Sequence, residues 1–285
     1  MTKKLLLLST GGTIASVVSD EGLAPGESGE ELIKMLGRLE YDITVRDILA
    51  LDSSNIQPEE WKIIAEAIYD HRNEYDGIVV SHGTDTMAYT ASMLTFMLQH
   101  INIPVVLTGS QVPMNVILSD APDNLRLAFA AAANCEPGVY IAFNRKVMRG
   151  CRSVKVRTTA FDAFESVNVP PVGEVTSDGF SIRDHRHPQP GKSQLNTKID
   201  THVSLVKLFP GFDPALLHAM AKNGCHGIVI EAYGLGGMTS IRRNMVAAVG
   251  ELIRNGIPII TSSQCLYERS DLTKYEVGRL ALLEG

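Results

Sequence analysis

The chain has 285 residues, of which 45% are hydrophobic and 20% are charged, and its formal net charge is −6. This composition is typical of a soluble globular protein with one large or two medium domains, and no segment approaches the roughly 18 apolar residues that a membrane-spanning helix requires. A nucleic-acid-binding protein normally carries a basic patch, which this acidic balance argues against. We therefore expect neither a nucleic acid nor a membrane among its partners.

Neither the N-terminus nor the cysteines indicate a secreted protein. The apolar run Leu5–Leu8 is too short for a signal peptide, and a Gly/Thr turn follows it in place of a cleavage site. We interpret it as the first strand of a cytoplasmic protein. No C-x-x-C spacing indicates a zinc site or a disulfide framework, and we expect the cysteines to be small core residues. They are Cys135, Cys151, Cys225 and Cys265.

In chain order, apolar strand-like runs alternate with helix-like stretches. The expected strands are 5–8, 78–80, 105–107 and 139–143, and the expected helices are 31–39, 58–72, 85–99 and 123–133. Pro58 suits the first turn of a helix, and the two glutamates after it suit the positive end of the helix dipole. This β–α–β order with continuous apolar strands predicts an α/β fold with a parallel sheet covered by helices on both faces.

The character of the sequence changes beyond Phe164, and we expect a second, smaller domain after this change. The segment 184–193 is polar and contains Pro and Gly, as interdomain linkers do. Strands at 203–209, 227–231 and 258–262 then alternate with helices at 214–222 and 245–255. We expect a large α/β domain over 1–183 with the catalytic residues, a linker over 184–200, and a smaller α/β domain over 201–285. Because 280–285 resembles no closing element, we expect the smaller domain to be incomplete at its C-terminus.

Two threonine segments carry the strongest functional signal. Ser9-Thr10-Gly11-Gly12-Thr13-Ile14-Ala15 follows the first apolar run, and Ser81-His82-Gly83-Thr84-Asp85-Thr86 follows the run 77–80. A buried strand that ends in a Gly/Thr turn before a helix is where open α/β sheets build their sites. Both turns offer hydroxyls and backbone N–H groups, so we expect them to form one reaction centre.

Each segment also has a structural interpretation. The first has neither the G-x-G-x-x-G spacing nor a P-loop lysine, and its glycines could simply make a tight turn in which Thr13 caps a helix. In the second, Thr84 could cap the next helix with Asp85 in its first turn, and His82 is interpreted as structural. A threonine hydroxyl is a poor nucleophile until a base or polarising network activates it. Lys155 would polarise Thr84 if the fold joined it to Asp85, and would otherwise be a solvated lysine.

With these motifs in view, the chain resembles the bacterial-type L-asparaginases, in their cytoplasmic type I branch. The resemblance runs from residue 3 to about residue 279. Its supporting segments are Asp52-Ser53-Ser54-Asn55, Thr108-Gly109-Ser110-Gln111, Lys155 before Phe161-Asp162-Ala163-Phe164, and Tyr233-Gly234-Leu235-Gly236. It implies a large flavodoxin-like domain, a smaller α/β domain, active sites at the carboxyl ends of the large domain's strands, and a homo-oligomer, either a dimer or a tetramer.

The resemblance also implies a reaction. Thr13 would attack the side-chain amide carbon of L-asparagine, giving a β-aspartyl enzyme and ammonia. Thr84, Asp85 and Lys155 would form a second catalytic cluster that tunes the attacking water. The residues expected to bind the substrate are Ser53, Ser54, Asp85 and Ser110. No cofactor and no metal are expected, because this acyl transfer needs only a hydroxyl nucleophile, an activator and N–H donors.

Leu23 departs from the family pattern, because many relatives have a tyrosine in the mobile loop after the first motif. We interpret the corresponding loop here, 18–28, mainly as a lid; the alternative is that a different tyrosine, a water or the Lys155 cluster activates Thr13 in place of the family tyrosine. Three alternative functions stay open: a glutaminase-asparaginase, the asparaginase-like subunit of a tRNA-dependent amidotransferase, which normally has an extra N-terminal domain, and a silent small-molecule binding protein on the same fold. Asparagine and glutamine differ by one methylene, worth only about 1–3 kcal/mol of discrimination.

Overall fold

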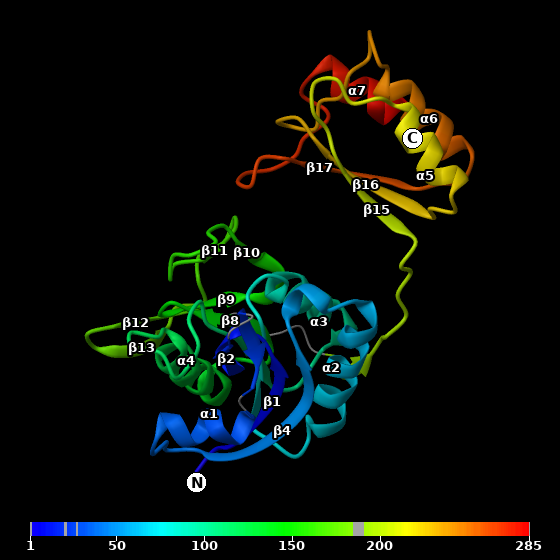
Figure 1. Ribbon diagram of the computed structural model, residues 1–285. Coiled ribbons are helices and arrows are strands. Elements are labelled where there is room, and N and C mark those ends of the chain that lie inside the picture. Colours follow the sequence, from blue (N-terminus) through cyan, green and yellow to red (C-terminus); the bar gives the residue numbers. More distant parts are fainter. Residues whose placement is uncertain (1, 20–21, 27, 185–190, 285) are drawn as a thin grey trace. The chain divides into compact units, whose positions relative to one another are not determined.

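The chain folds into two compact units, residues 1–197 and 198–285, in a computed structural model that describes residues 2–19, 22–26, 28–184 and 191–284 (Figure 1). Unit 1 extends past residue 183 because β14 (Gln194–Leu195) pairs with β6 (Leu98–Gln99) of the same unit. Of the expected linker, residues 185–190 lie outside the described residues. No helix within the described ranges is long and apolar enough to cross a membrane.

Unit 1 is built on an eight-stranded sheet in the order β13-β12-β9-β8-β7-β5-β1-β4. Its parallel strands are β1 (Lys4–Gly11), β4 (Asp42–Leu51), β5 (Gly77–Ser81), β7 (Pro104–Thr108) and β8 (Gly138–Phe143). The antiparallel strands are β9 (Lys146–Arg149), β12 (Gly173–Thr176) and β13 (Gly179–Ile182). The expected α/β fold with a large parallel sheet is confirmed.

Helices cover both faces of this sheet, as the continuous apolar strands predicted. Figure 1 shows α1 (Gly29–Leu36) and α4 (Ala121–Asn134) on one side, and α2 (Pro58–His71) and α3 (Met87–Met97) on the other. Leu5 and Leu7 of β1 share a buried core with residues of α1 and α4. Successive strand side chains point to opposite faces, so Leu6 and Leu8, also fully buried, face the other layer.

Strand β4 was missed by the sequence analysis. Its polar residues Asp42, Thr44 and Arg46 interrupt the apolar pattern, and none of its residues is fully buried. It is the last strand of the sheet order and pairs with β1 alone among the described strands. An edge strand carries less apolar surface than a central one, which explains the weak signal. Its importance is that it delivers Asp52 and Ser53 to the carboxyl end of β1.

Two predicted helices have different ends in the structure. The helix expected to continue to residue 39 stops at Leu36, because Gly37 follows with a positive φ of 73°. The helix expected at 85–99 spans only Met87–Met97, and its N-cap residue is Thr86. The interpretation of Thr84 as a helix cap was therefore wrong. Thr84 and Asp85 lie in the turn before the helix, which leaves their side chains available for other contacts.

The segment expected to be a loop at 18–28 contains a β-hairpin. Strands β2 (Ser16–Ser19) and β3 (Gly22–Pro25) pair in antiparallel register, with Val18 opposite Leu23. Residues 20, 21 and 27 of the expected loop lie outside the described residues. The hairpin corrects the expectation of irregular structure, and the interpretation of this segment as a lid stays a prediction.

Unit 2 has a three-stranded parallel sheet, β15-β16-β17, with its core on one face. The strands are β15 (Val203–Lys207), β16 (Gly227–Ala232) and β17 (Ile259–Ser263), and the helices are α5 (Ala215–Lys222), α6 (Met245–Arg254) and α7 (Glu276–Leu283). Helix α7 buries Ala281 in this core, and Arg254 donates to Glu284 at 2.6 Å. The expectation that the smaller domain is incomplete at its C-terminus stays a prediction.

The cysteines only partly follow the expectation of core residues. Cys135 is buried in the core of unit 1 and Cys225 is half-buried, but Cys151 and Cys265 are exposed. All four are free thiols. Cys151 is the middle residue of the 3-10 helix Gly150–Arg152 and Cys265 lies two residues after β17, where the apolar periodicity used to predict burial gives no signal.

Candidate active site

The two threonine motifs meet because β1 and β5 are neighbouring parallel strands. Ser9 of β1 is the register partner of Ser81 of β5, so both motifs leave the same edge of the sheet. The Thr10 hydroxyl donates to the Ser81 carbonyl at 2.8 Å, and the His82 N–H donates to the carbonyl of Thr108, at the end of β7, at 2.8 Å. This edge holds the carboxyl ends of the strands, where open α/β sheets bind ligands.

Close backbone contact joins these motifs to the segment after β4. A Cβ atom added to Gly12 would collide with the backbone of Gly83, and one added to Gly83 would lie 2.6 Å from the Ser53 Oγ. Gly12 also has a φ of 80°, which a side chain would strain. Glycine at these two positions lets Thr13, Thr84 and Ser53 come from three adjoining backbone segments. The predicted meeting of the two motifs is thereby observed in the backbone.

Thr13 opens a short 3-10 helix, Thr13–Ala15, and is half-buried. The N-cap of that helix is Gly12, so the interpretation of Thr13 as a cap was wrong. The Gly12 carbonyl accepts from the Ala15 N–H at 3.1 Å and from the Ser16 hydroxyl at 2.9 Å. These bonds fix the turn that carries Thr13 without using the Thr13 side chain.

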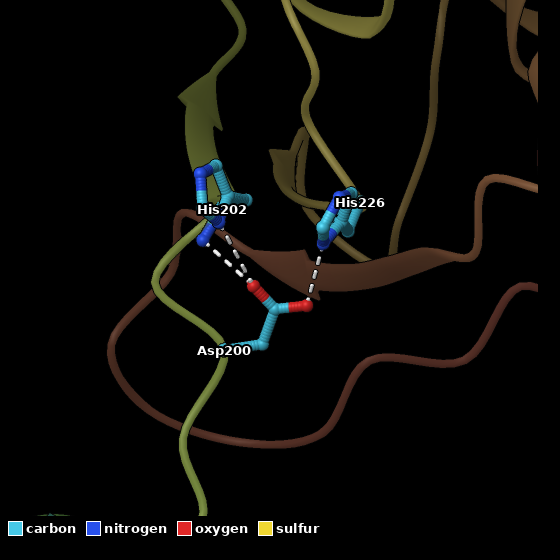
Figure 2. Close-up of side chains that lie close together, drawn as sticks. All are labelled: Asp200, His202 and His226. Atoms are coloured by element: carbon cyan, nitrogen blue, oxygen red, sulfur yellow. Dashed lines mark hydrogen bonds and ion pairs between the residues drawn. The ribbon is translucent and has the colours of Figure 1, made fainter.

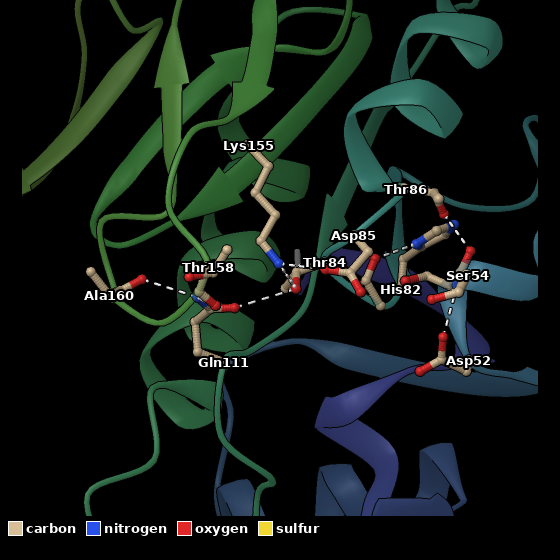
Figure 3. A network of polar contacts seen from close by, with 12 residues as sticks. Asp52, Ser54, His82, Thr84, Asp85, Thr86, Gln111, Lys155, Thr158 and Ala160 are labelled. Atoms are coloured by element: carbon tan, nitrogen blue, oxygen red, sulfur yellow. Dashed lines mark hydrogen bonds and ion pairs between the residues drawn. The ribbon is translucent and has the colours of Figure 1, made fainter.

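Lys155 contacts both Thr84 and Asp85 (Figure 3). Its ammonium lies 2.8 Å from the Thr84 Oγ1 and 2.6 Å from the Asp85 Oδ1. The Lys155 side chain is 17% exposed, whereas that of Asp85 is 62% exposed. Lys155 is therefore not a solvated lysine, and the Thr–Lys–Asp arrangement that the chemistry required is present.

A small hairpin delivers Lys155 to this point. Strand β10 (Ser153–Lys155) pairs with β11 (Phe164–Ser166), with Lys155 opposite Phe164. The Phe164 ring contacts the Phe143 ring of β8, with 4.9 Å between centroids. This aromatic contact attaches the hairpin to the main sheet and thereby fixes the origin of the lysine side chain.

Gln111 is a contact of Thr84 that the sequence analysis missed. The Thr84 hydroxyl donates to the Gln111 Oε1 at 3.3 Å, and the Gln111 Nε2 donates to the carbonyls of Thr158 and Ala160 at 3.0 and 3.1 Å (Figure 3). The Asp120 carboxylate accepts from the Gln111 backbone N–H at 3.0 Å. The available signal was its place in the segment Thr108-Gly109-Ser110-Gln111, which follows the apolar run 105–107.

The three predicted substrate-binding serines differ in their surroundings. Ser53 is buried, and its carbonyl accepts from the Thr86 hydroxyl at 2.7 Å, which joins it to the start of α3. Ser54 is exposed, and its N–H donates to the Asp52 carboxylate at 2.8 Å. Ser110 is buried and donates its hydroxyl to the Val112 carbonyl at 2.6 Å. Of the three, Ser53 has a side chain in close contact with the glycine of the second motif.

A buried hydrogen-bond chain supports the turn that carries Thr84. The Trp61 Nε1 donates to the Thr90 Oγ1 at 3.0 Å, and the Thr90 hydroxyl lies 2.9 Å from the His82 Nε2. The His82 Nδ1 lies 2.7 Å from the Gly83 carbonyl, an acceptor. Hence Nδ1 carries the proton, Nε2 accepts from Thr90, and the ring is neutral. Complete burial lowers the pKa of His82 to about 4, with the Gly83 bond opposing it.

This arrangement suits activation of a hydroxyl. The Thr84 oxygen accepts from an ammonium and donates to an uncharged amide, so partial negative charge on that oxygen is stabilised. Asp85 accepts from the same ammonium and so holds it beside the threonine oxygen. Hydroxyl, ammonium and carboxylate are thus connected by hydrogen bonds.

Comparison with known proteins identifies the family of this chain. The family description "Asparaginase, N-terminal" matches residues 4–188, and "Glutaminase/Asparaginase C-terminal domain" matches residues 202–285. The chain belongs to the asparaginase family. The resemblance inferred from the threonine motifs is confirmed. As a member of this family of amidohydrolases, the chain is an enzyme.

Individual asparaginase-family relatives cover nearly the whole chain. The L-asparaginase of Thermococcus kodakarensis is 43% identical over 99% of this chain and 86% of its own, and its solved structure superposes with a TM-score of 0.93. The structure of L-asparaginase I from Vibrio cholerae is 28% identical, covers 100% of this chain and 93% of its own, and has a TM-score of 0.85. A glutamyl-tRNA(Gln) amidotransferase subunit from Methanopyrus kandleri is 36% identical over 98% of this chain but only 65% of its own.

Proposed function

We propose that this protein hydrolyses L-asparagine to L-aspartate and ammonia through a covalent intermediate on Thr13. The Thr13 oxygen attacks the side-chain amide carbon and loses its proton, and the carbon–nitrogen bond breaks as the leaving nitrogen gains a proton. Ammonia departs and a β-aspartyl ester remains on Thr13. Water then attacks the ester, gives its proton to the Thr13 oxygen, and releases aspartate.

The contacts among Thr84, Asp85 and Lys155 carry this proposal. A threonine hydroxyl needs a polarising group before it takes part in the reaction, and the Lys155 ammonium at 2.8 Å polarises the Thr84 oxygen, which belongs to the water-activating cluster and is not the nucleophile. In the proposed reaction this cluster orients the water of the second step and relays its proton to the Thr13 oxygen. Backbone N–H groups of the two turns hold the developing oxyanion, each worth about 2.7–4 kcal/mol in comparable enzymes.

Substrate recognition is proposed at Ser53 and Asp85, with Ser54 and Ser110 as further contacts. Asp85 is 62% exposed although one oxygen accepts from Lys155, so its carboxylate is accessible to a substrate α-ammonium group. Ser53 lies against Gly83 and so can reach the α-carboxylate of a substrate seated over the second turn. With the substrate α-ammonium held at Asp85 and its α-carboxylate held at Ser53, the side-chain amide of the substrate would be oriented toward Thr13.

The decisive experiment is ammonia release from L-asparagine by the purified chain and its threonine variants. Thr13→Ala and Thr84→Ala should each nearly abolish turnover while the circular dichroism spectrum stays unchanged. The matched control is Thr95→Ala, which removes a threonine hydroxyl that, among the described residues, donates to the helix carbonyl of Ala91 at 2.8 Å. If either active-site variant kept more than about a tenth of wild-type kcat, a loss under about 1.4 kcal/mol, its catalytic role would be withdrawn.

A second candidate function is favoured by the 36% identity to a subunit of a tRNA-dependent amidotransferase. A glutaminase-asparaginase is the alternative within the hydrolases. Both are separated from the main proposal by measuring kcat/KM for free asparagine and free glutamine on one preparation. Efficient hydrolysis of asparagine alone supports the asparaginase. Equal efficiency supports the dual enzyme, and silence toward both amino acids favours the amidotransferase subunit or a binding protein.

We also propose that the protein assembles as a dimer or tetramer. Val203, Leu205 and Ile260 lie on the sheet face of unit 2 opposite its helices, and they are 50%, 59% and 62% exposed. Contiguous exposed apolar residues of this kind mark interaction surfaces. A cytoplasmic location stays a prediction, in keeping with a similar solved structure, that of a probable cytoplasmic L-asparaginase from Campylobacter jejuni.

A further inference from the structure

Three side chains of the types that can bind a metal ion lie close together in unit 2 and take no part in the proposed reaction. They are Asp200, His202 and His226 (Figure 2). His202 immediately precedes β15 and His226 immediately precedes β16, and the first register pair of these parallel strands is Val203 with Gly227. The two histidines therefore lie side by side at the amino ends of the strands. Their rings are 4.9 Å apart at an interplanar angle of 36°.

The backbone around this cluster is well fixed. The His226 N–H donates to the His202 carbonyl at 2.7 Å, which extends the ladder by one pair beyond the strands. The His202 N–H donates to the Asp200 Oδ1 at 2.9 Å, so the aspartate folds back over the residue two positions later. These two hydrogen bonds keep Asp200, His202 and His226 close together, and both are made within this group of three residues.

The carboxylate of Asp200 lies between the two rings. Its Oδ2 is 2.7 Å from the His226 Nδ1, and its Oδ1 is 3.4 Å from the His202 Nδ1. The bonds from the His202 N–H and from the His226 ring lower the pKa of Asp200, so the group is ionised at neutral pH. One ligand atom from each residue lies within 4.8 Å of the other two.

From this geometry we propose that Asp200, His202 and His226 form a binding site for a divalent transition metal ion such as Zn²⁺ or Ni²⁺. Two imidazoles and one carboxylate suit these borderline ions, whereas Mg²⁺ and Ca²⁺ prefer an all-oxygen shell. Tetrahedral ligand atoms at about 2.0–2.2 Å from an ion lie about 3.4 Å apart, so the His226 Nδ1 and Asp200 Oδ2 atoms, now 2.7 Å apart, would move slightly apart to admit it. Exposed side chains make this adjustment easily, since they are 51–64% accessible to solvent.

Solvent exposure also defines the kind of site. Three protein ligands on one side leave the remaining coordination positions to water, as in open metal sites. The ion would join Asp200, near the first residue of unit 2, to the amino ends of two adjacent strands, and so would stabilise the start of this unit.

Isothermal titration calorimetry with ZnCl₂ and, separately, NiCl₂ on the full-length chain without a polyhistidine tag tests the proposal. We expect one ion per chain, and binding at least about tenfold weaker in His202→Ala and in His226→Ala. The matched control is His218→Ala, because His218 is also an exposed histidine paired with a carboxylate, Glu251, at 3.5 Å. That variant should bind like the wild type.

A thermal scan provides an independent readout. Zn²⁺ at about 100 times its dissociation constant should raise the Tm of the wild type and the His218→Ala variant by about 5 °C, and should leave that of His202→Ala unchanged. Absence of binding by the wild type would overturn the proposal. So would binding that persists unchanged in His202→Ala and His226→Ala, which is the result expected if the exposed thiols of Cys151 and Cys265 captured the ion.

Discussion

The buried histidine beside the active-site turn should make the stability of unit 1 depend on pH in a defined window. His82 is fully buried, and its pKa in the folded chain is lowered from the ordinary value of 6.5 to about 4. As the pH falls below 6.5, the unfolded chain binds this proton and the folded chain does not. The free energy of unfolding therefore decreases between pH 6.5 and about 4, and above pH 6.5 this group has no effect on it.

The size of the effect follows from the two pKa values. The interval from 6.5 to about 4, at 1.36 kcal/mol per pKa unit, corresponds to about 3 kcal/mol of stability lost on acidification. Carboxylates also titrate in this range, so the histidine contribution has to be isolated by substitution. His82→Gln removes the titrating group but keeps a polar side chain of similar reach, and should reduce the loss between pH 7 and pH 4 by about that amount.

Urea unfolding followed by tryptophan fluorescence is the appropriate assay. Trp61 is the only tryptophan of the chain, and it reports on unit 1 because it donates to Thr90 in the same hydrogen-bond chain as His82. The control is His218→Gln, which removes an exposed histidine of unit 2 and should leave the pH dependence at wild-type size. Equal pH dependence in wild type and His82→Gln would refute the reasoning, because it would mean that the buried ring accepts a proton without loss of structure.

Three further predictions concern catalysis and assembly. Lys155→Met should lower kcat at least about a hundredfold with a much smaller change in the urea midpoint; a kcat within tenfold of wild type would contradict the proposed activation of Thr84. Leu23→Ala should raise KM and reduce kcat roughly tenfold, about 1.4 kcal/mol, if the hairpin acts as a lid; a loss as large as that of Thr13→Ala would instead place this segment in the chemistry. Leu205→Lys should shift the mass measured by light scattering toward the monomer, and a wild type already monomeric and fully active at micromolar concentration would disprove the proposed oligomer.

The sequence by itself determined the fold class and the two segments that matter most. Continuous apolar runs such as Gly77–Ser81 can be buried only between two layers of helices, so the parallel sheet followed from local pattern. Gly/Thr turns directly after such strands predicted the edge of the sheet at which the two threonine motifs meet. Family resemblance, carried by Thr13, Thr84 and the residues around them, was confirmed by comparison over the whole chain.

Tertiary structure decided what the local pattern left open. Lys155 is separated by 71 positions from Thr84, and only the β10–β11 hairpin brings its ammonium to the hydroxyl. Likewise, Gln111 reaches Thr84 because β7 happens to neighbour β5 in the sheet order. Edge strand β4 was missed because its apolar pattern is mixed with polar residues, and helix α7 was missed because its apolar pattern is short. Burial of either element depends on its neighbours in the fold. Spacing along a chain encodes local periodicity, whereas contacts between distant residues depend on strand order, which no local pattern contains.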